Sequence, residues 1–395
     1  MSELKVLVVD DSALMRSLVS RIVESAPDLT VAGTAMNGEF ALSKIPRLEP
    51  DVIVLDLEMP TMNGIAFLKE HSRQGIGIPV IILSSIATKG AAVTMEALSL
   101  GASDFITKPS GSVSHDIHTV ADQLLAMIRG YGSGWRRTRG HSTPEPPPNH
   151  AIEPRSGSTF RADQSGEAAA APPAPPAAPT APAASASSQA VPERRPRSRP
   201  GKLELIVIGI STGGPNALRK VFGEISGDLG VPVVVVQHMP AGFTSEFAQS
   251  LNRISPLEIK EAAEGDILKP NRVLIAPGNY HIEVERRSLA GIVHINQNEL
   301  QNGHRPSAGV LFSSAARHFG RGCMAVIMTG MGRDGAAEIG EIYEAGGMTV
   351  GQDESSSVVY GMPRVAQENG YLHRQVGLEE MAATISSLAA ELRGS

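Results

Sequence analysis

A serine, a histidine and an aspartate in the second half of the chain each come shortly after an apolar, strand-like run. Ser211 directly follows the run Leu205–Ile210, and His238 and Asp334 come after two later runs. Parallel strands place their carboxyl ends at one edge of a sheet, where open α/β folds bind ligands, so we expect these side chains to meet. A serine hydroxyl needs an adjacent base, which His238 can be if a carboxylate such as Asp334 orients it. The three residues therefore predict nucleophilic catalysis by serine.

The segment that follows Ser211 adds a place for developing negative charge. It spans Thr212–Pro215 and holds two glycines, and a helix is expected from Pro215 to about Phe222 because proline suits a first helical turn. Backbone N–H groups at such a helix start can receive an oxyanion. By itself the segment is also typical of a glycine turn or an anion-binding loop without chemistry, so the hypothesis depends on further motifs.

Other histidines are rivals for the role of base: His281, His294, His304 and His318. None of the four follows a buried parallel strand as His238 does, so His238 ranks first. A metal site would need two or three His or Cys residues at ligand spacing, and His238 has no such neighbour. The one cysteine, Cys323, lies in an apolar run and is expected to be a buried packing residue instead of a nucleophile.

The first 130 residues alternate strand and helix patterns five times. Such alternation predicts a parallel sheet with helices on both faces. The strand-like runs are Leu4–Val9, Thr30–Ala35, Val52–Leu57, Val80–Leu83 and Asp104–Ile106.

Polar residues come at the carboxyl ends of these runs. Asp10 and Asp11 end the first, Asp56 the third and Ser84 the fourth, and Lys108 follows the fifth. Converging carboxylates would repel one another unless a hard cation lay among them, and oxygen ligands suit Mg²⁺. Asp56 could then accept a phosphoryl group whose oxygens Lys108 and Ser84 hold. Taken singly, each residue is also typical of a solvated loop.

This set resembles the receiver domain of two-component response regulators, and the loops Met59–Gly64 and Phe105–Pro109 match that family closely. The resemblance implies a flavodoxin-like domain with five parallel strands in the order 2-1-3-4-5. It also implies phosphorylation at Asp56 and a conformational switch that involves Phe105 together with the serine and lysine named above. Asn63 stands where many receivers have aspartate.

The hydrophobic pattern stops between the two α/β regions. Residues 144–148 and 168–184 are rich in proline and alanine, and such segments cannot bury enough apolar surface to order themselves. We therefore expect a receiver domain over residues 1–130, a disordered linker over 131–201 and a second domain over 202–395. A cluster of arginines at 194–199 is read as part of a solvated tether, with docking to an acidic partner as the alternative.

The second domain carries, in order, motifs that resemble those of the protein-glutamate methylesterase of bacterial chemotaxis, the CheB family. They are Ile208–Pro215, Gln237–Pro240, Ile275–Gly278 with His281, Arg305–Ser307, Met328–Gly335, Ala345–Gly347, Gln352–Glu354 and Gly361–Pro363. The resemblance implies a doubly wound α/β methylesterase domain with Ser211 as nucleophile, His238 as general base and Asp334 as its orienting acid. It places the N–H of Met331 in the oxyanion hole and Thr212 beside the nucleophile.

The resemblance further implies a phosphorylation-activated enzyme. It would hydrolyse glutamate γ-methyl esters, and deamidate glutamines, on methyl-accepting chemoreceptors, with a chemotaxis histidine kinase as phosphodonor. Mg²⁺ would serve receiver phosphorylation, and ester hydrolysis would need no cofactor. Gly309 departs from the family, which usually has an acidic residue there. The alternative hypothesis is a non-catalytic module that binds a receptor or kinase when phosphorylated.

Composition limits the remaining possibilities. The formal net charge of −6 argues against a general nucleic-acid binder, and no basic recognition-helix pattern is present. Aromatic residues make up only 4% of the chain, so the cores must be aliphatic. No apolar stretch has the length of a membrane span, and the chain starts with a strand-like run instead of a signal peptide. We therefore expect a cytoplasmic protein that does not insert into a membrane.

Overall fold

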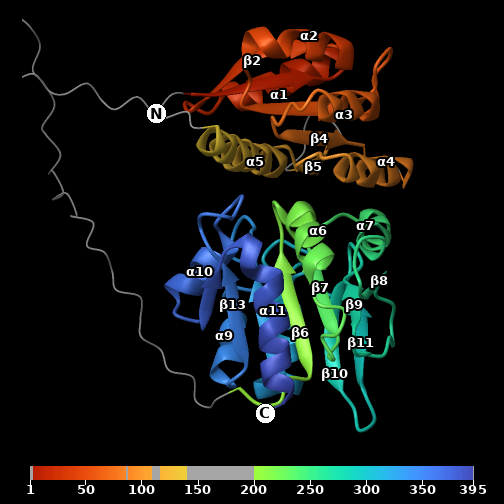
Figure 1. Ribbon diagram of the computed structural model, residues 1–395, viewed down its shortest axis with the longest axis vertical. Helices are drawn as coiled ribbons and strands as arrows, with labels where there is room; N and C mark the ends of the chain where they lie inside the picture. The colour runs from red at the N-terminus through yellow and green to blue at the C-terminus, as the bar shows by residue number, and fades with distance from the viewer. Residues whose placement is uncertain (1–2, 86–87, 109–115, 140–199, 395) are drawn as a thin grey trace, which may run out of the picture. The chain divides into compact units, whose positions relative to one another are not determined.

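The computed structural model describes residues 3–85, 88–108, 116–139 and 200–394. These residues form two parallel β-sheets, each covered by its own helices (Figure 1). Residues 140–199 lie outside the described part, so the disordered linker stays a prediction. None of the described helices is long and apolar enough to cross a bilayer.

The N-terminal sheet has five parallel strands in the order β2-β1-β3-β4-β5, which confirms the predicted receiver fold. Apart from Lys5 and the polar residues that end β3 and β4, strands β1, β3 and β4 are apolar, because helices cover both faces of the sheet. The strands are β1 (Leu4–Val9), β2 (Leu29–Ala35), β3 (Val52–Asp56), β4 (Val80–Ser84) and β5 (Asp104–Thr107), and the helices are α1 (Ala13–Glu24), α2 (Gly38–Leu48), α3 (Gly64–Arg73), α4 (Thr88–Ser99) and α5 (Asp116–Thr138).

Side-chain caps begin three of these helices. Ser12, Asn37 and Asn63 each accept a backbone hydrogen bond from the first turn of α1, α2 and α3. Such caps satisfy N–H groups that have no partner inside the helix. Asn63, the departure from the receiver pattern, accepts from Ala66 N at 2.9 Å and so does the capping that an aspartate would do.

Helix α5 continues to Thr138, so the predicted start of the linker at residue 131 falls inside a helix. This end of the helix contains Gly130, Gly132 and Gly134, and glycine is a poor helix former. Tertiary contacts outweigh that local preference. A Cβ at Gly132 would lie 3.0 Å from Val52 Cγ2, so the glycine lets the helix approach the sheet closely, and Arg136 Nε donates to Asp51 Oδ1 at 2.9 Å.

The C-terminal sheet has seven parallel strands in the order β14-β13-β12-β6-β7-β9-β8. The chain runs outward from β6 in both directions, which confirms the predicted doubly wound fold. The strands are β6 (Leu205–Ile210), β7 (Val233–Gln237), β8 (Glu258–Glu261), β9 (Arg272–Ile275), β12 (Cys323–Ile327), β13 (Met348–Gln352) and β14 (Arg374–Val376), and β10 (His281–Arg286) pairs with β11 (Gly291–Asn296) in a separate antiparallel hairpin.

Helices cover both faces of this sheet. Ile206, Ile208 and Ile210 of β6 join the core under α6, α7 and α11, whereas Leu205 and Val207 join the core under α8 and α9. Figure 1 shows α6 and α11 side by side in front of β6. The helices are α6 (Gly214–Glu224), α7 (Phe243–Asn252), α8 (Ala308–Phe319), α9 (Ile339–Glu344), α10 (Met362–Glu368) and α11 (Leu378–Arg393), with a 3₁₀ turn η1 (Gly320–Gly322).

Candidate active site

The three predicted catalytic residues lie at neighbouring strand ends. Ser211 follows β6, His238 follows β7, and Asp334 lies in the loop after β12. Because β12, β6 and β7 are adjacent in the sheet, their carboxyl ends bring the loops together at the point where the winding reverses. Ser211 and Asp334 are buried, with 4% and 1% of their surfaces exposed, and His238 is partly buried.

His238 bridges the other two residues. Its Nδ1 lies 3.1 Å from Ser211 Oγ, and its Nε2 lies 2.8 Å from Asp334 Oδ2. An ionised carboxylate can only accept, so Nε2 carries the proton and donates it to Asp334, which leaves Nδ1 to accept from the serine hydroxyl. The imidazole is thus held in the tautomer that a general base requires.

Asp334 is held as a charged partner by several donors. Ser307 Oγ donates to Oδ1 at 2.6 Å, Asn302 Nδ2 donates to Oδ1 at 3.1 Å, and Ala308 N donates to Oδ2 at 2.6 Å. Burial disfavours the charged form, but hydrogen bonds from His238, Ser307 and Asn302 outweigh it and keep the pKa of Asp334 well below its usual range. The carboxylate also sits at the N-terminus of α8, where negative charge is favoured.

His304 is a neighbour of His238 that sequence reasoning ranked as a rival base. Its ring stacks on the ring of His238 with centroids 3.9 Å apart and planes 14° apart. Burial, and then the nearby His238, lower the pKa of His304 to about 4, so its ring is neutral near pH 7. It lies against the base instead of replacing it.

A tight turn brings both His304 and Asn302 to the site. Gln301 and His304 exchange backbone hydrogen bonds of 3.1 and 2.9 Å, and Asn302 and Gly303 both have positive φ, 53° and 79°. Asn-Gly is the strongest sequence signal for such a turn. The Asn302-Gly303 dipeptide predicts this turn, and it could have indicated from the sequence that His304 and Asn302 lie together beside Asp334.

Glycines let the nucleophile segment pack closely. Gly213 has a φ of 83°, a left-handed conformation that favours glycine, and it directly precedes α6. A Cβ at Gly330 would lie 2.8 Å from Ser211 Cβ. Ser211 N donates to Thr329 O at 3.0 Å, and Gln237 Nε2 donates to Ser211 O at 3.0 Å, so the backbone of the nucleophile is fixed from both neighbouring strands.

Two donors near Ser211 have no partner among the described residues. Thr212 Oγ1 is buried without a hydrogen bond, and in the described part of the chain Met331 N makes none either. Thr212 is buried, where an unpaired donor is costly, whereas 39% of the Met331 surface is exposed. An oxyanion that forms during a reaction would accept a hydrogen bond from both groups. Both therefore remain candidates for the oxyanion hole.

Of the other rivals for the base, His281 and His294 pair with residues outside the Ser211 site, and His318 lies in the last turn of α8. His281 Nε2 pairs with Glu299 O at 3.0 Å, and His294 lies between Glu285 and Glu264, whose hydrogen bonds raise its pKa. The Cys323 thiol is buried, and burial raises its pKa, which makes it inert as a nucleophile.

The receiver residues gather at the carboxyl edge of the first sheet. Lys108 Nζ lies 3.0 Å from Asp10 Oδ2 and 2.8 Å from Asp56 Oδ2. Burial raises the pKa of Asp56, with Lys108 opposing and Asp10 adding to the shift. Burial also works against the charge on Lys108, but the hydrogen bond and the charge of Asp56 raise its pKa overall. One cation is therefore shared by two buried carboxylates.

Asp10, Asp11 and Asp56 fit a hard cation. Their carboxylate oxygens all lie within 4.8 Å of one another, with Asp11 exposed and the other two buried. Anionic oxygen ligands beside solvent are what Mg²⁺ selects. The residues predicted to hold Mg²⁺ are thus together.

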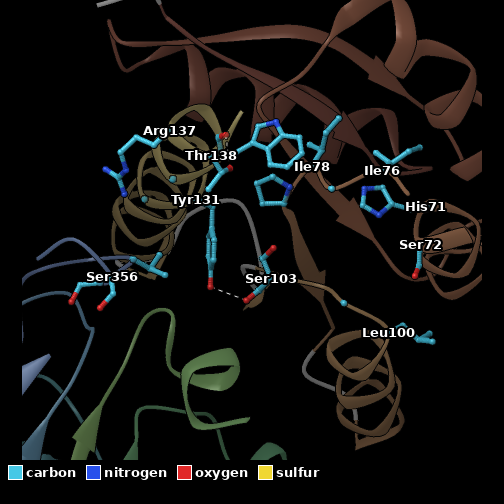
Figure 2. A pocket seen from close by; sticks show the side chains of 18 of the residues that line it. His71, Ser72, Ile76, Ile78, Leu100, Ser103, Tyr131, Arg137, Thr138 and Ser356 are labelled. Atoms are coloured by element: carbon cyan, nitrogen blue, oxygen red, sulfur yellow. Dashed lines mark hydrogen bonds between the residues drawn. The ribbon is translucent and has the colours of Figure 1, made fainter. Parts of the chain in front are cut away.

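Two of the predicted switch residues, Ser84 and Phe105, lie on β4 and β5, the last two strands of the receiver sheet. Ser84 Oγ lies 2.7 Å from Thr94 Oγ1 of α4, and Phe105 of β5 is buried. Figure 2 shows Tyr131 of α5 pointing its hydroxyl at the start of β5, where it donates to Ser103 O at 2.7 Å. Tyr131 thereby ties the last receiver helix to the strand that carries Phe105.

A receiver joined to a doubly wound domain with a serine-histidine-aspartate arrangement defines a response regulator whose output domain has the geometry of a serine hydrolase. A CheB methylesterase family model matches residues 206–385, and a response regulator receiver domain model matches residues 6–118. The chain belongs to the CheB methylesterase family.

Relatives that match over nearly the whole chain include two from Treponema species. Both are named protein-glutamate methylesterase/protein-glutamine glutaminase. The one from Treponema denticola is 52% identical over 99% of this chain and 100% of its own, and the one from Treponema pallidum is 50% identical over 98% and 97%. The crystal structure of the Thermotoga maritima CheB methylesterase catalytic domain is 33% identical over 47% of this chain and 98% of its own, with a TM-score of 0.46.

Proposed function

We propose that this chain is a protein-glutamate methylesterase and protein-glutamine glutaminase that uses Ser211, His238 and Asp334. The observation that carries the proposal is the bridge that His238 makes between Ser211 Oγ and Asp334 Oδ2, in a chain whose relatives are named for this activity. The intact geometry gives no support to the alternative of a non-catalytic binding module.

In the first step Ser211 Oγ forms a bond to the carbonyl carbon of the ester, and its proton passes to Nδ1 of His238. Asp334 stabilises the imidazolium through the hydrogen bond to Nε2. The carbonyl oxygen becomes an oxyanion, for which Thr212 Oγ1 and Met331 N are the donors. When the carbon–methoxy bond breaks, the proton on Nδ1 passes to the methoxy oxygen and methanol leaves.

The second step releases the glutamate. Nδ1 of His238 accepts a proton from water as the water oxygen attacks the acyl-serine carbonyl, and the proton then returns to Ser211 Oγ as the acyl bond breaks. A glutamine side chain would follow the same route with ammonia as the first leaving group. No step requires a cofactor beyond the side chains of this site.

The receiver would control this hydrolysis through phosphorylation at Asp56. A carboxylate oxygen of Asp56 forms a bond to the phosphorus of the donor as the bond from phosphorus to the donor's leaving atom breaks and the dephosphorylated donor departs. Lys108 and Ser84 then hold the phosphoryl oxygens. Mg²⁺ bound by Asp10, Asp11 and Asp56 would neutralise charge on the phosphoryl group during transfer. Coupling between such a site and a distant one is about 1–3 kcal/mol, or about 5- to 150-fold in an equilibrium.

The partners follow from the proposed reaction. The substrates would be methyl-accepting chemoreceptors, and the phosphodonor would be a chemotaxis histidine kinase. We place this chain and its reaction in the cytoplasm. It would reach the membrane only through the receptor, without inserting, and would bind no nucleic acid.

The test is methanol release from methylated receptors. Wild type should release methanol, and release should rise with a small-molecule phosphodonor plus Mg²⁺. Ser211→Ala should release none, whereas the matched control Ser387→Ala, on the exposed side of α11, should behave like wild type. Full activity in Ser211→Ala would overturn the assignment of the nucleophile.

The receiver half has its own test. Asp56→Asn should lose the stimulation by phosphodonor, because an amide cannot form the acyl phosphate. Asp28→Asn, which changes an exposed receiver aspartate paired with Arg129, should keep it. Stimulation that survives in Asp56→Asn would place the phosphorylation elsewhere.

A further inference from the structure

Gly309 is an unusual residue for its place. It is the second residue of α8, where glycine is a poor helix former and an acidic residue would suit the helix N-terminus. A Cβ built at this position would lie 2.9 Å from Glu338 Cδ and 3.0 Å from Glu338 Oε2. The carboxylate of Glu338 thus occupies the space that a side chain on residue 309 would take.

Glu338 reaches this space from the other side of the site. It lies four residues after Asp334, at the start of α9, and its side chain is partly buried. Its Oε2 is buried and accepts no hydrogen bond from the described residues. The same built Cβ on Gly309 would lie 3.3 Å from Asp334 Oδ1, so both carboxylates border one small volume.

Burial and the charge of Asp334 raise the pKa of Glu338, and backbone hydrogen bonds from Glu338 and Gly335 oppose that shift without cancelling it. The surroundings of Glu338 therefore disfavour its charged form. A buried, unpaired carboxylate oxygen beside another carboxylate does not stabilise the fold. Such arrangements are found where a charge serves a site.

We propose that Glu338 is a positioning residue that supplies, from α9, the negative charge that the chain lacks at position 309. The inference rests on the proposed roles of His238 and Asp334. Glu338 lies on the Oδ1 side of Asp334, opposite the oxygen that holds His238. Its charge favours the imidazolium that forms when Ser211 loses its proton, and it acts through Asp334 without touching the substrate.

Other charged groups face the same space and must be considered. Glu283 of β10 and Arg317 of α8 line the small cavity next to Glu338. Glu341, one turn further along α9, accepts from Ser313 Oγ at 3.0 Å and adds to the pKa shift of Glu338. His304 stacks on the far face of His238 and is neutral near pH 7. Glu341 is therefore the matched control, because it is a carboxylate on the same helix with its own hydrogen bond.

The first experiment compares pH profiles of methanol release by the full chain without phosphodonor, between pH 5 and 8. Glu338→Gln removes the charge and keeps the shape. We expect the acidic limb of its profile to move down by about half a pH unit and its plateau rate to fall about threefold, because the imidazolium is less favoured. Glu341→Gln should give the wild-type profile. A Glu338→Gln profile that coincides with wild type would overturn the inference.

The second experiment moves the carboxylate across the gap. Glu338→Ala opens the space and should shift the profile as Glu338→Gln does. Adding Gly309→Asp to Glu338→Ala returns a carboxylate from α8 and should restore the wild-type profile. If the double variant has the folded circular dichroism spectrum of wild type but the profile of Glu338→Ala, a charge at this place is not what matters and the proposal fails.

The two proposals fail in different ways. Activity that survives in Ser211→Ala would remove the proposed catalytic site, whatever the Glu338 variants do. An inactive Ser211→Ala combined with an unshifted Glu338→Gln would leave the catalytic site standing and remove only the role of Glu338.

Discussion

The two sheets of this chain each carry a buried aspartate at the carboxyl edge, yet the two carboxylates are held in opposite ways. Asp334 accepts hydrogen bonds from His238, Ser307 and Asn302, which keep its pKa well below the usual range despite burial. Asp56 has Lys108 as its cation and another carboxylate nearby, and burial raises its pKa.

Both aspartates are buried, with 3% of Asp56 and 1% of Asp334 exposed, so the number of hydrogen-bond donors decides the direction of the pKa shift. A carboxylate surrounded by donors is a fixed charge, suited to orienting a base and stabilising its cation. A carboxylate whose cationic partner is a lysine shared with a second carboxylate can give up that ion pair and act as a nucleophile. An aspartate at the carboxyl edge of a parallel sheet can therefore be a fixed charge or a reactive group, and its hydrogen-bond donors decide which.

The strongest test of this comparison is Asp334→Asn. The amide keeps the shape but offers an N–H, so it can favour the wrong tautomer of His238, and we expect the rate to fall about 10⁴-fold. Methanol release with saturating receptor measures the effect. The matched control is Asp353→Asn, which changes a carboxylate bonded to Ser355 and Ser356 outside the site. A loss below tenfold in Asp334→Asn would mean that the carboxylate is not the orienting group.

The second test removes the shared cation with Lys108→Ala. Asp10 and Asp56 would then be buried together without a partner, so we expect the receiver to lose about 3 kcal/mol of unfolding free energy at pH 7. Urea unfolding followed by circular dichroism measures this loss. Lys69→Ala, which removes a lysine from an exposed ion pair with Glu96, should cost less than about 1 kcal/mol. Equal losses in the two variants would mean that Lys108 does not offset repulsion between Asp10 and Asp56.

The third test uses acid, because the opposite pKa shifts predict opposite slopes of stability with pH. Asp334 has a folded pKa below its ordinary value of 3.8, so its stabilising contribution is present above about pH 4 and is lost as the pH falls further. Asp56 has a folded pKa above 3.8, so the folded state binds its proton more tightly and its contribution falls as the pH rises through that raised value.

Urea unfolding between pH 3 and 6 measures both slopes. The deficit of Asp334→Asn against wild type should shrink as the pH falls. Asp56→Asn should become more stable relative to wild type as the pH rises. Slopes of the same sign for the two variants would mean that the two carboxylates are not held differently after all.

The fourth test concerns the ring that packs on the base. His304→Ala removes the stack and admits water to the face of His238, and we expect the rate to fall about tenfold, in line with the energy of an aromatic pair. His304→Phe keeps a neutral ring there and should stay within about threefold of wild type. If His304→Phe loses as much activity as His304→Ala, the imidazole nitrogens of His304 matter and not the stack.

The smallest effect is expected at the receiver's departure from its family. Asparagine and aspartate cap helices about equally well, so Asn63→Asp should change the unfolding free energy by less than about 0.5 kcal/mol. Asn63→Ala removes the bond to Ala66 N and should cost about 1 kcal/mol. Thermal unfolding distinguishes the two variants. A large loss in Asn63→Asp would show that the amide has a second role.

The sequence predicted both sheets well where strands are apolar throughout. The runs at β1, β3 and β6 were visible because strands covered on both faces are continuous in hydrophobicity. The edge strands of the second sheet were missed: three of the four residues of β8 (Glu258–Glu261) are charged, and β14 (Arg374–Val376) is mostly exposed. The end of α5 was missed because the sheet contact that explains Gly132 cannot be seen in the sequence.

By itself the sequence determined which residues stand at the strand ends, and therefore that Ser211, His238 and Asp334 could meet. Strand hydrophobicity and local motifs carry that information, since both depend on neighbours in the chain. Only the tertiary structure decided that Nδ1 of His238 faces the serine, that His304 stacks on the base and that Glu338 fills the space beside Gly309. These contacts join loops from distant strands, so their geometry depends on how the whole domain packs.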